Sequence, residues 1–261
     1  MLLHSTYKGT DSLEESTSSV ILLHGLFGMA DNLGMVAKPL SESFRVYSLD
    51  LRNHGRSFRA GSMLFSEMAG DVERFMDSKG ISSAYLIGHS LGGKVAMQTA
   101  LQAPERVKAM VVADIAPVAY VGSHDEVFAG LRAIDLPSIN SRRQAETILR
   151  DYIVDPGVRL FLMKSLYKDR AGVFAWRMNV EALHACYEQM RFAVQAEKPF
   201  CGPTLFIKGE QSQYITEQHR DAIVNLFPAA KIKIIQNTGH WLHAEKPVAF
   251  NRLVKNFLEE N

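Results

Sequence analysis

The chain has 261 residues, 47% of them hydrophobic and 22% charged, a composition that excludes a disordered or fibrous protein. The length fits one large domain, or a domain with an insertion, with a sizeable buried core. Because 29 basic and 28 acidic residues leave a formal net charge of +1, no broad field would attract nucleic acid or anionic lipid, and we expect neither nucleic acid nor a membrane as a partner.

The N-terminus and the cysteines indicate where the protein resides. The opening residues lack the apolar run of about 7 to 15 residues that a signal peptide needs, and no stretch approaches the roughly 18 apolar residues of a membrane helix. Cys186 and Cys201 are too few for a disulfide framework, and we expect both to be reduced thiols in the core. The sequence therefore predicts a soluble, cytoplasmic protein.

Short β-rich runs alternate with amphipathic helical segments, as in strand–helix–strand units that build a mostly parallel sheet. Several runs are apolar almost throughout, as strands covered on both faces must be. The predicted strands are residues 20–24, 45–50, 83–88, 108–114, 204–209 and 231–235. We further predict a helix over 66–80 that ends at Gly80, and a last helix that begins near Pro247. Residues 10–19 are typical of a solvated loop after an N-terminal edge strand.

One region breaks this alternation. From about residue 122 to 196 no convincing strand is present, and segments such as 144–154 and 159–169 are typical of helices. We therefore expect a core formed by 1–118 and 200–261, with a helical cap insertion over 119–199. Because open parallel sheets bind ligands at the carboxyl ends of their strands, a cap leaving from that edge would roof the site.

The stretch LIGHSLGGKV, residues 86–95, fits two kinds of site. Gly88, Gly93 and Lys94 nearly match the phosphate-binding pattern G-x-x-x-x-G-K-[ST]. That pattern needs a serine or threonine after the lysine to bind magnesium, and Val95 stands there instead. The sequence therefore disfavours a nucleotide-binding loop.

The same stretch matches G-x-S-x-G, the turn that presents a nucleophilic serine, through Gly88, Ser90 and Gly92. A strand that passes abruptly into a helix strains the serine backbone and crowds any nearby Cβ, so glycines must flank it. The β-rich run before this turn and the helix-forming run after it fit that context. We predict that Ser90 is a nucleophile at a helix N-terminus, with a plain glycine-rich turn as the alternative.

A serine nucleophile requires a base, here expected later in the chain. His240 and His243 both follow the last predicted strand. His240 lies on a short loop after Gly239, the expected setting of such a base, and the chain order of serine first and histidine last supports it. His243 is better explained as a first-turn helical or surface residue.

The oxyanion formed at an attacked carbonyl needs preorganised backbone N–H donors. We expect one donor from Leu91, since a helix N-terminus leaves amides free. The second is expected from HGLFG, which follows a predicted strand. The amide of Leu26 is the favoured donor there, with Phe27 as the less favoured choice.

Five stretches together resemble a known family: VILLHGLFG, DLRNHGRS, LIGHSLGGKVAMQTAL, ADIAP and GHWLHAEKP. They resemble the α/β-hydrolase superfamily and, more narrowly, its YbfF-type esterases. The resemblance runs from about residue 20 to the C-terminus and is weakest across the insertion. It implies the α/β-hydrolase fold, an eight-stranded mostly parallel sheet with a helical cap insertion, and carboxylesterase activity on short acyl chains.

The acid that would orient His240 departs from the superfamily's usual pattern. An Asp is usual in the loop after residues 204–209, but that loop carries Glu210 and Ser212. Asp114 ends the preceding predicted strand, and the YbfF-type group, which this chain resembles, has its acid one strand earlier. The resemblance therefore implies Asp114 as the acid and Ser212 as a hydroxyl in the same network. Glu210 is the competing acid, and capping of a turn is the alternative role for Asp114.

The stretch DLRNHGRS is expected to hold its own turn through a charged network of Asp50, Arg52 and His54 rather than to act in catalysis. His24, His54 and His89 lack metal-binding spacing, and no cysteine cluster accompanies them. We therefore expect neither a metal nor a cofactor.

The predicted reaction is acyl transfer to water through an acyl-serine, with His240 first as base and then as acid. Phe27 and Trp176 are expected to line an apolar acyl pocket, with core packing as the alternative. Basic residues of the insertion indicate either a solvated face or a preference for anionic esters and acyl-CoA thioesters. They are Arg142, Arg143, Lys164, Lys168, Arg170 and Arg177.

Two other classes of function fit the same residues. A carbon–carbon hydrolase or lyase of this fold would also keep Ser90, His240 and the acid. A binding protein with a vestigial site is the second class. The intact Ser90 and His240 favour an enzyme acting on a small-molecule ester or thioester.

Overall fold

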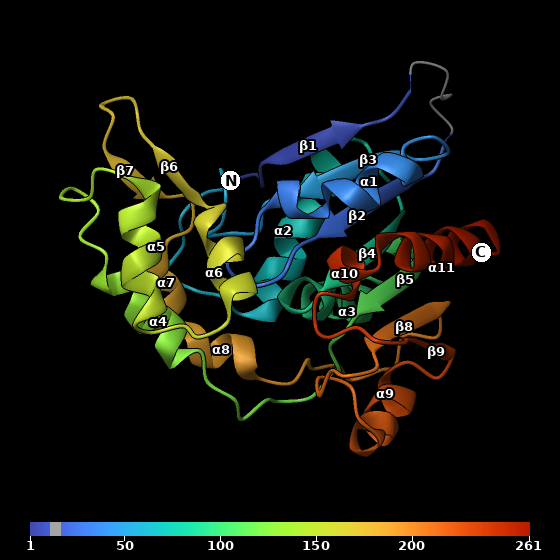
Figure 1. Cartoon of the computed structure of the whole chain (residues 1–261). Coiled ribbons are helices and arrows are strands. Elements are labelled where there is room, and N and C mark those ends of the chain that lie inside the picture. The colour runs from blue at the N-terminus through green and yellow to red at the C-terminus, as the bar shows by residue number, and fades with distance from the viewer. Residues whose placement is uncertain (11–16) are drawn as a thin grey trace.

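The computed structural model describes residues 1–10 and 17–261, so most of the loop predicted over 10–19 lies outside the described residues. Within these ranges, seven strands form one sheet in the order β1-β3-β2-β4-β5-β8-β9 (Figure 1). The edge strand β1 (Ser5–Lys8) runs antiparallel to β3, and the other neighbours are parallel. The parallel strands therefore end at one common edge.

The other six strands of the sheet confirm the six predicted runs. They are β2 (Ser19–Leu23), β3 (Arg45–Leu49), β4 (Ala84–His89), β5 (Val107–Ala113), β8 (Thr204–Gly209) and β9 (Ala230–Ile235). The count of eight strands implied by the family resemblance is wrong for the described residues. The two additional strands pair with each other in the insertion, and β1 and β9 form the edges of the sheet.

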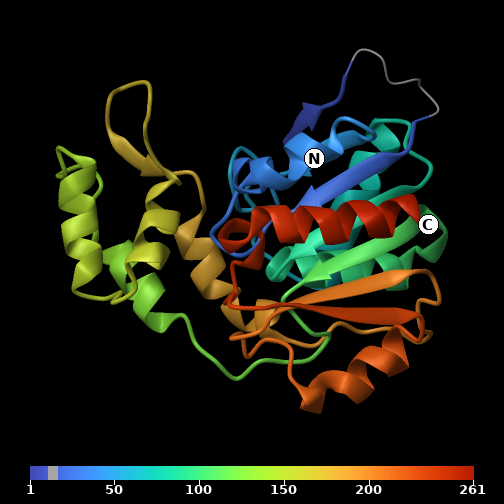
Figure 2. The same cartoon turned by 45° about the vertical axis from the view of Figure 1, so that its right-hand side comes forward.

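Helices cover both faces of the sheet (Figure 2). Those of the core are α1 (Gly34–Leu40), α2 (Phe65–Ser78), α3 (Leu91–Gln102), α9 (Arg220–Leu226), α10 (Leu242–Glu245) and α11 (Pro247–Glu259), with short 3-10 turns at Ala30–Leu33, Pro104–Arg106 and Glu217–His219. As predicted, α11 begins at Pro247, and Gly80 follows the end of α2 with a φ of 64°. In the described part of the chain, no helix is long and apolar enough to cross a bilayer.

The side chains of each buried strand divide between two hydrophobic cores. Ile21 and Leu23 belong to the core that contains the buried face of α2 and α3. Val20 and Leu22 belong to the core that contains the buried face of α1 and α11. Alternate residues thus serve opposite faces, which is why these strands are apolar throughout.

The residues between β5 and β8 form a separate helical layer beyond the carboxyl edge of the sheet (Figure 1). Its elements are α4 (Asp125–Ala133), α5 (Arg142–Arg150), α6 (Pro156–Met163), β6 (Leu166–Lys168), β7 (Phe174–Trp176), α7 (Val180–Ala185) and α8 (Tyr187–Arg191). We refer to residues 119–199 as the insertion.

The prediction that this region has no strand is wrong, because β6 and β7 form an antiparallel hairpin. Each strand has three residues, too few for a two-residue hydrophobic period to be visible. The hairpin depends on its turn, where the Asp169 carboxylate accepts the N–H groups of Ala171 and Val173 and Gly172 adopts a φ of 81°. The segment predicted as a helix over 159–169 therefore changes from helix to strand after Met163.

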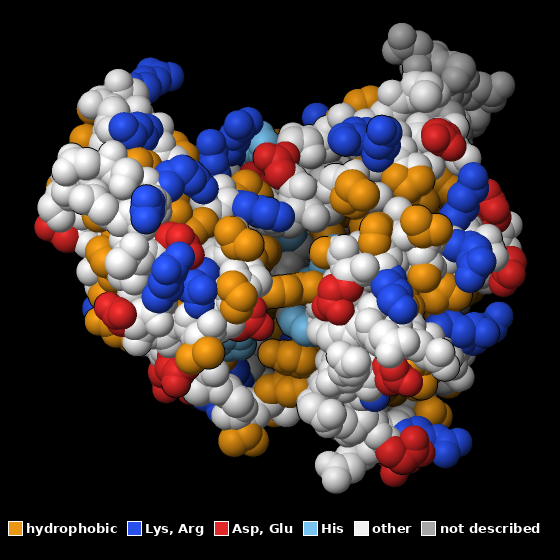
Figure 3. Space-filling model, in the orientation of Figure 1, with side chains coloured by type: hydrophobic (Ala, Val, Ile, Leu, Met, Phe, Trp, Pro, Cys, Tyr) orange, Lys and Arg blue, Asp and Glu red, His pale blue; other side chains and the backbone are white. Residues whose placement is uncertain are grey.

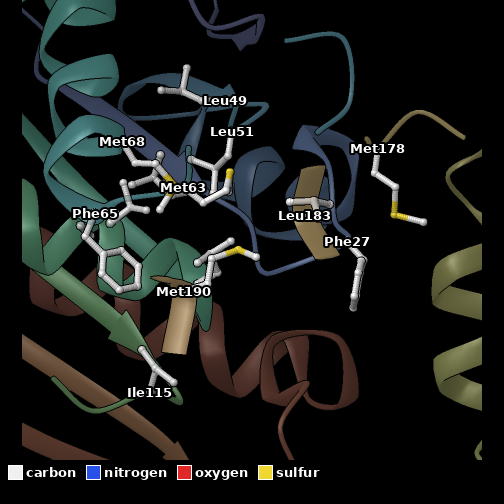
Figure 4. Close-up of a cluster of buried hydrophobic side chains, with 14 of the residues drawn as sticks. Phe27, Leu49, Leu51, Met63, Phe65, Met68, Ile115, Met178, Leu183 and Met190 are labelled. Carbon is white, nitrogen blue, oxygen red and sulfur yellow. The ribbon is translucent and has the colours of Figure 1, made fainter. Parts of the chain in front are cut away.

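One buried hydrophobic cluster joins the insertion to the core (Figure 4). Met178, Leu183 and Met190 of the insertion belong to the same cluster as Phe27 and Phe65 of the core. Burial of this apolar surface holds the insertion against the sheet domain.

The two cysteines are free but differ in environment. Cys186 is buried in the insertion, whereas Cys201 is exposed in the segment that returns to β8. The prediction of two core thiols is therefore wrong for Cys201, because the neighbouring Phe200 takes the buried position in that segment.

Candidate active site

Ser90 lies at the turn between β4 and α3, at the carboxyl edge of the sheet. Its φ of 52° and ψ of −119° are strained for a residue with a side chain. A Cβ on Gly88 would lie 2.2 Å from the carbonyl oxygen of Gly92, and a Cβ on Gly92 would lie 2.2 Å from that of Leu23. Only glycine at these two positions lets the strand turn so sharply into the helix.

Asp114 directly follows β5, the neighbour of β4 in the sheet, and also has a positive φ, 54°. Its buried carboxylate accepts three hydrogen bonds. Oδ2 accepts from His240 Nδ1 at 2.7 Å and from the hydroxyl of Ser212, and Oδ1 accepts from the N–H of Gly209 at 3.0 Å. Because an ionised carboxylate only accepts, the neutral His240 ring carries its proton on Nδ1 and leaves Nε2 unprotonated.

The loop that carries His240 is held against the turn of Ser90. The His240 ring stacks on the ring of Tyr214, with centroids 4.0 Å apart and an interplanar angle of 24°. His89, which immediately precedes Ser90, donates from Nε2 to the main-chain carbonyl of His240 at 2.8 Å. The rings of His89 and His240 lie 4.8 Å apart. The structure thus brings together the two loops predicted to hold nucleophile and base.

The loop after β2 lies beside Ser90, since a Cβ on Gly25 would lie 3.3 Å from the Cβ of Ser90. The N–H of Phe27 donates to Nε2 of His54 at 3.1 Å. In contrast, the N–H groups of Leu26 and Leu91 have no hydrogen-bond partner within the described residues. The two amides favoured by sequence are therefore available to a ligand, and the less favoured Phe27 amide is occupied.

Two buried histidines hold this loop in place. His54 donates from Nδ1 to the main-chain carbonyl two residues before it at 2.9 Å, which leaves Nε2 to accept the Phe27 N–H. His24 donates from Nδ1 to the carbonyl of Gly25 at 2.8 Å and accepts the N–H of Leu51 at 3.0 Å. Burial lowers the pKa of His54 to about 3 and also lowers the pKa of His24. Both rings therefore remain neutral acceptors at neutral pH.

These buried histidines should make the protein sensitive to acid. Burial lowers the pKa of His54 to about 3 and that of His243 to about 4, whereas both are protonated below about pH 6.5 in the unfolded chain. As the pH falls from 7 to 5, these rings take up protons in the unfolded state but not in the folded state. Each ring should therefore lower the free energy of unfolding by about 2 kcal/mol over this range. Urea titrations at both pH values measure this loss, and His54→Phe or His243→Phe should each reduce it by about 2 kcal/mol. An equal loss of unfolding free energy in wild type and both variants would contradict the conclusion that His54 and His243 are buried and neutral.

The competing residues have other contacts. Glu210 is exposed, and its carboxylate accepts the N–H of Asn237 at 2.8 Å. His243 lies in the first turn of α10, as predicted for a helical residue, but it is buried rather than on the surface. Its ring lies 4.4 Å from that of His89. Within the described residues, neither side chain hydrogen bonds to His240 or Asp114.

The two residues predicted to line the acyl pocket occupy different places. Phe27 reaches the insertion, where its ring lies 5.1 Å from Phe128 of α4 and 6.1 Å from His124. Trp176 is buried in β7, and its indole N–H has no hydrogen-bond partner within the described residues. Both side chains belong to the same buried hydrophobic cluster, and the contacts of Phe27 also link the loop after β2 with the insertion.

The insertion also covers the His240 loop. Phe161 of α6 packs against Trp241, which follows His240, with ring centroids 5.5 Å apart. Figure 3 shows a hollow between the insertion and the core, with hydrophobic and histidine side chains visible in it. Of the basic residues singled out on the insertion, Arg142 donates to two main-chain carbonyls and Arg177 lies 4.5 Å above the ring of Tyr167.

The network predicted for DLRNHGRS is confirmed in part: Asp50 and Arg52 form charged contacts, but Arg52 pairs with α2 rather than within the turn, and His54 is neutral. The Asp50 carboxylate accepts the N–H groups of Ala30 at 2.7 Å and of Arg56 at 2.9 Å. Arg52 pairs with the buried Asp71 at 2.6 Å. Among the residues that the structure describes, no group of three or more His, Cys, Asp and Glu side chains is placed to hold a metal ion.

Comparison with known proteins assigns this arrangement to a family. A sequence model described as the alpha/beta hydrolase fold matches residues 18–136. Esterase YbfF of Escherichia coli (strain K12) is 39% identical over 250 residues, covering 95% of each chain. The chain belongs to the α/β-hydrolase family. Within this family it is a YbfF-type esterase, and thus a hydrolase.

Further α/β-hydrolases support this placement along the whole chain. The sn-1-specific diacylglycerol lipase ABHD11 of Mus musculus is 36% identical and covers 92% of this chain and 80% of its own length. A solved structure, described as a marine microorganism esterase, has a TM-score of 0.93 and 37% identity, and covers 98% of this chain and 99% of its own. The likeness therefore extends through the insertion, beyond residue 136 where the family model ends.

Several contacts of this α/β-hydrolase site leave no signal in the sequence. Tyr214 stacks on His240, and His54 holds the Phe27 amide. His89 lacks metal-binding spacing in the sequence, and in the structure it binds the His240 loop. Its position beside Ser90 is the one available signal, because contacts between distant loops leave no periodic pattern.

Proposed function

We propose that this α/β-hydrolase is a serine esterase that hydrolyses carboxylic esters with short acyl chains through an acyl-serine intermediate. Ser90 is the nucleophile, and His240 is the general base and then the general acid. Asp114 orients the His240 ring and stabilises its protonated form, and the Ser212 hydroxyl completes the hydrogen bonding of that carboxylate.

The two steps follow from these roles. Ser90 Oγ adds to the ester carbonyl carbon while His240 Nε2 takes the hydroxyl proton. The negative charge on the carbonyl oxygen is stabilised by the N–H groups of Leu26 and Leu91. The alcohol oxygen then leaves with the proton from His240. Water adds to the acyl-serine with the same histidine as base, which releases the carboxylic acid and restores the Ser90 hydroxyl.

The observation that carries this proposal is the 2.7 Å contact between His240 Nδ1 and the buried Asp114 carboxylate, next to the strained turn of Ser90. The contact fixes the tautomer that a base for serine needs, with Nε2 unprotonated. Strained backbone at Ser90 and Asp114 supports the same assignment, since such strain clusters at functional sites.

The proposed substrate class rests on the surroundings of Ser90. Phe27, on the loop beside Ser90, packs against Phe128 of the insertion, and we infer that the acyl group is received next to this buried apolar contact. The names of the similar Esterase YbfF and diacylglycerol lipase denote enzymes that act on esters. We propose that this chain acts on the same class of bond. Acyl-CoA thioesters form a second proposed class, which the basic residues of the insertion favour through attraction of the CoA phosphates.

A series of acyl-chain lengths tests the proposal. We expect p-nitrophenyl acetate and butyrate to be hydrolysed faster than the octanoate and palmitate, and the matching CoA thioesters to show the same order. Hydrolysis of a carbon–carbon bond in a β-diketone, without hydrolysis of any ester, would instead identify a carbon–carbon hydrolase of this fold. No turnover of any of these compounds would indicate a binding protein.

A further inference from the structure

Lys94 is a buried cation that the proposed reaction does not use. It lies on α3 one turn after Ser90, and 1% of its surface is exposed. Within the described residues, no carboxylate lies within ion-pair distance of its ammonium group. A buried charge without a counter-charge is costly, so its retention calls for a specific role.

The Lys94 ammonium group contacts the segment where the chain leaves the insertion. Nζ donates to the main-chain carbonyl of Phe192 at 2.5 Å and approaches that of Arg191 at 3.3 Å. It also lies 4.9 Å from the ring centroid of Tyr120 and 5.3 Å from that of Phe65. Two carbonyls and two aromatic faces thus stabilise the cation in place of a carboxylate.

The two segments that connect the insertion to the core meet at this point. The N–H of Tyr120, on the incoming segment, donates to the carbonyl of Arg191 at 3.0 Å. The Arg191 side chain donates back to the carbonyls of Tyr120 at 2.9 Å and Val121 at 2.8 Å. Gln98, one turn after Lys94, exchanges two hydrogen bonds with the main chain of Gln195 at 2.9 and 3.1 Å. The nucleophile helix therefore holds the base of the insertion through two side chains.

We propose that Lys94 is a positioning residue that fastens the base of the insertion to the nucleophile helix and so keeps the insertion over the active site. The role in turnover rests on the proposed esterase function. Ser90, Asp114 and His240 all belong to the core, so a loosened insertion should weaken substrate binding and leave the chemical step nearly intact.

The surroundings of Lys94 make this contact dependent on pH. Burial lowers the pKa of Lys94 to about 7. The ionisable groups around it are the Tyr120 hydroxyl, which donates to the carbonyl of Tyr214, and Arg191, which pairs with Glu188 at 2.6 Å. None of them supplies a counter-charge. The ammonium group therefore loses its proton near neutral pH, and its hold on the Phe192 carbonyl weakens.

Steady-state kinetics of Lys94→Met with a p-nitrophenyl ester tests the proposal. We expect KM to rise about tenfold at pH 6, the effect of one lost charge-assisted hydrogen bond, with kcat within about threefold of wild type. Above about pH 7 the wild-type KM should rise towards that of the variant. Gln98→Leu should raise KM at all pH values without removing this dependence. Lys108→Met is the control, because Lys108 also lies over a tyrosine ring, but it is exposed, donates to the hydroxyl of Ser18 and lies at the opposite end of β5 from the insertion.

Amide hydrogen exchange gives a readout that does not require turnover. In wild type, the N–H groups of Tyr120 and Gln195 should exchange about tenfold faster, after correction for the intrinsic rate, at pH 8.5 than at pH 6. Lys94→Met should show the fast rate at both pH values. If Lys94→Met has the same KM and the same exchange rates as wild type, the proposal is overturned. If the variant fails to fold, exchange in wild type that does not depend on pH overturns it. If wild type itself does not hydrolyse the ester, the proposed function is refuted. The exchange rates alone then decide whether Lys94 fastens the base of the insertion.

Discussion

Ser90→Ala is expected to lower kcat for ester hydrolysis by about 10⁴- to 10⁶-fold. The variant lacks the oxygen that forms the acyl-enzyme in the proposed mechanism, and the remaining rate should come from substrate binding and the amides of Leu26 and Leu91. Steady-state assays with p-nitrophenyl butyrate measure the loss. KM should change little, because the hydroxyl acts in the transition state.

The control for Ser90→Ala is the same substitution at a serine that has no part in the reaction. Ser138→Ala removes an exposed hydroxyl that caps a main-chain carbonyl in the insertion, and its kcat should match wild type within about twofold. Circular dichroism should show that Ser90→Ala is folded. If the folded Ser90→Ala variant kept more than about 1% of the wild-type kcat, Ser90 would not be the nucleophile.

Asp114→Asn is expected to lower kcat by about 10⁴-fold. An amide in place of the carboxylate would present a donor to His240 Nδ1 and favour the opposite tautomer, in which Nε2 carries the proton and cannot act as base. The pH dependence of kcat/KM for the residual activity should change as well, since the protonated ring has lost its counter-charge. The same ester assay measures both effects.

Two further variants make this experiment decisive. Glu210→Gln should change kcat by less than about threefold, because the Glu210 carboxylate binds the Asn237 amide and not His240. Ser212→Ala should cost about tenfold, the effect of one lost hydrogen bond to the Asp114 carboxylate. A crippled Glu210→Gln beside an active Asp114→Asn would show that the acid was assigned to the wrong strand.

The sequence carried enough information for the sheet and for the turn of Ser90. Buried parallel strands are apolar on both faces, so the six runs stand out against the amphipathic helices between them. The tight turn demands glycine at positions 88 and 92, where a Cβ would come within 2.2 Å of a carbonyl oxygen. These features depend on neighbours in the chain, which is why the pattern reveals them.

Features that depend on contacts between distant segments were not predictable in this way. The hairpin of β6 and β7 is too short for a period and depends on Asp169 and Gly172 in its turn. The stacking of Tyr214 on His240 and the hydrogen bond from Phe27 to His54 each join two separate loops. The resemblance to a family pointed to Asp114 as the acid, because position along the chain does not say which strand end lies nearest His240.

Covalent labelling tests most directly whether His240 activates the hydroxyl of Ser90. A fluorophosphonate reacts with an activated serine, and mass spectrometry of the digested protein identifies the labelled peptide. We expect one label on the peptide that contains Ser90 in wild type, none in Ser90→Ala, and labelling slowed by at least about 10³-fold in His240→Ala. An unlabelled wild type, or a label that persists in Ser90→Ala, would contradict the account.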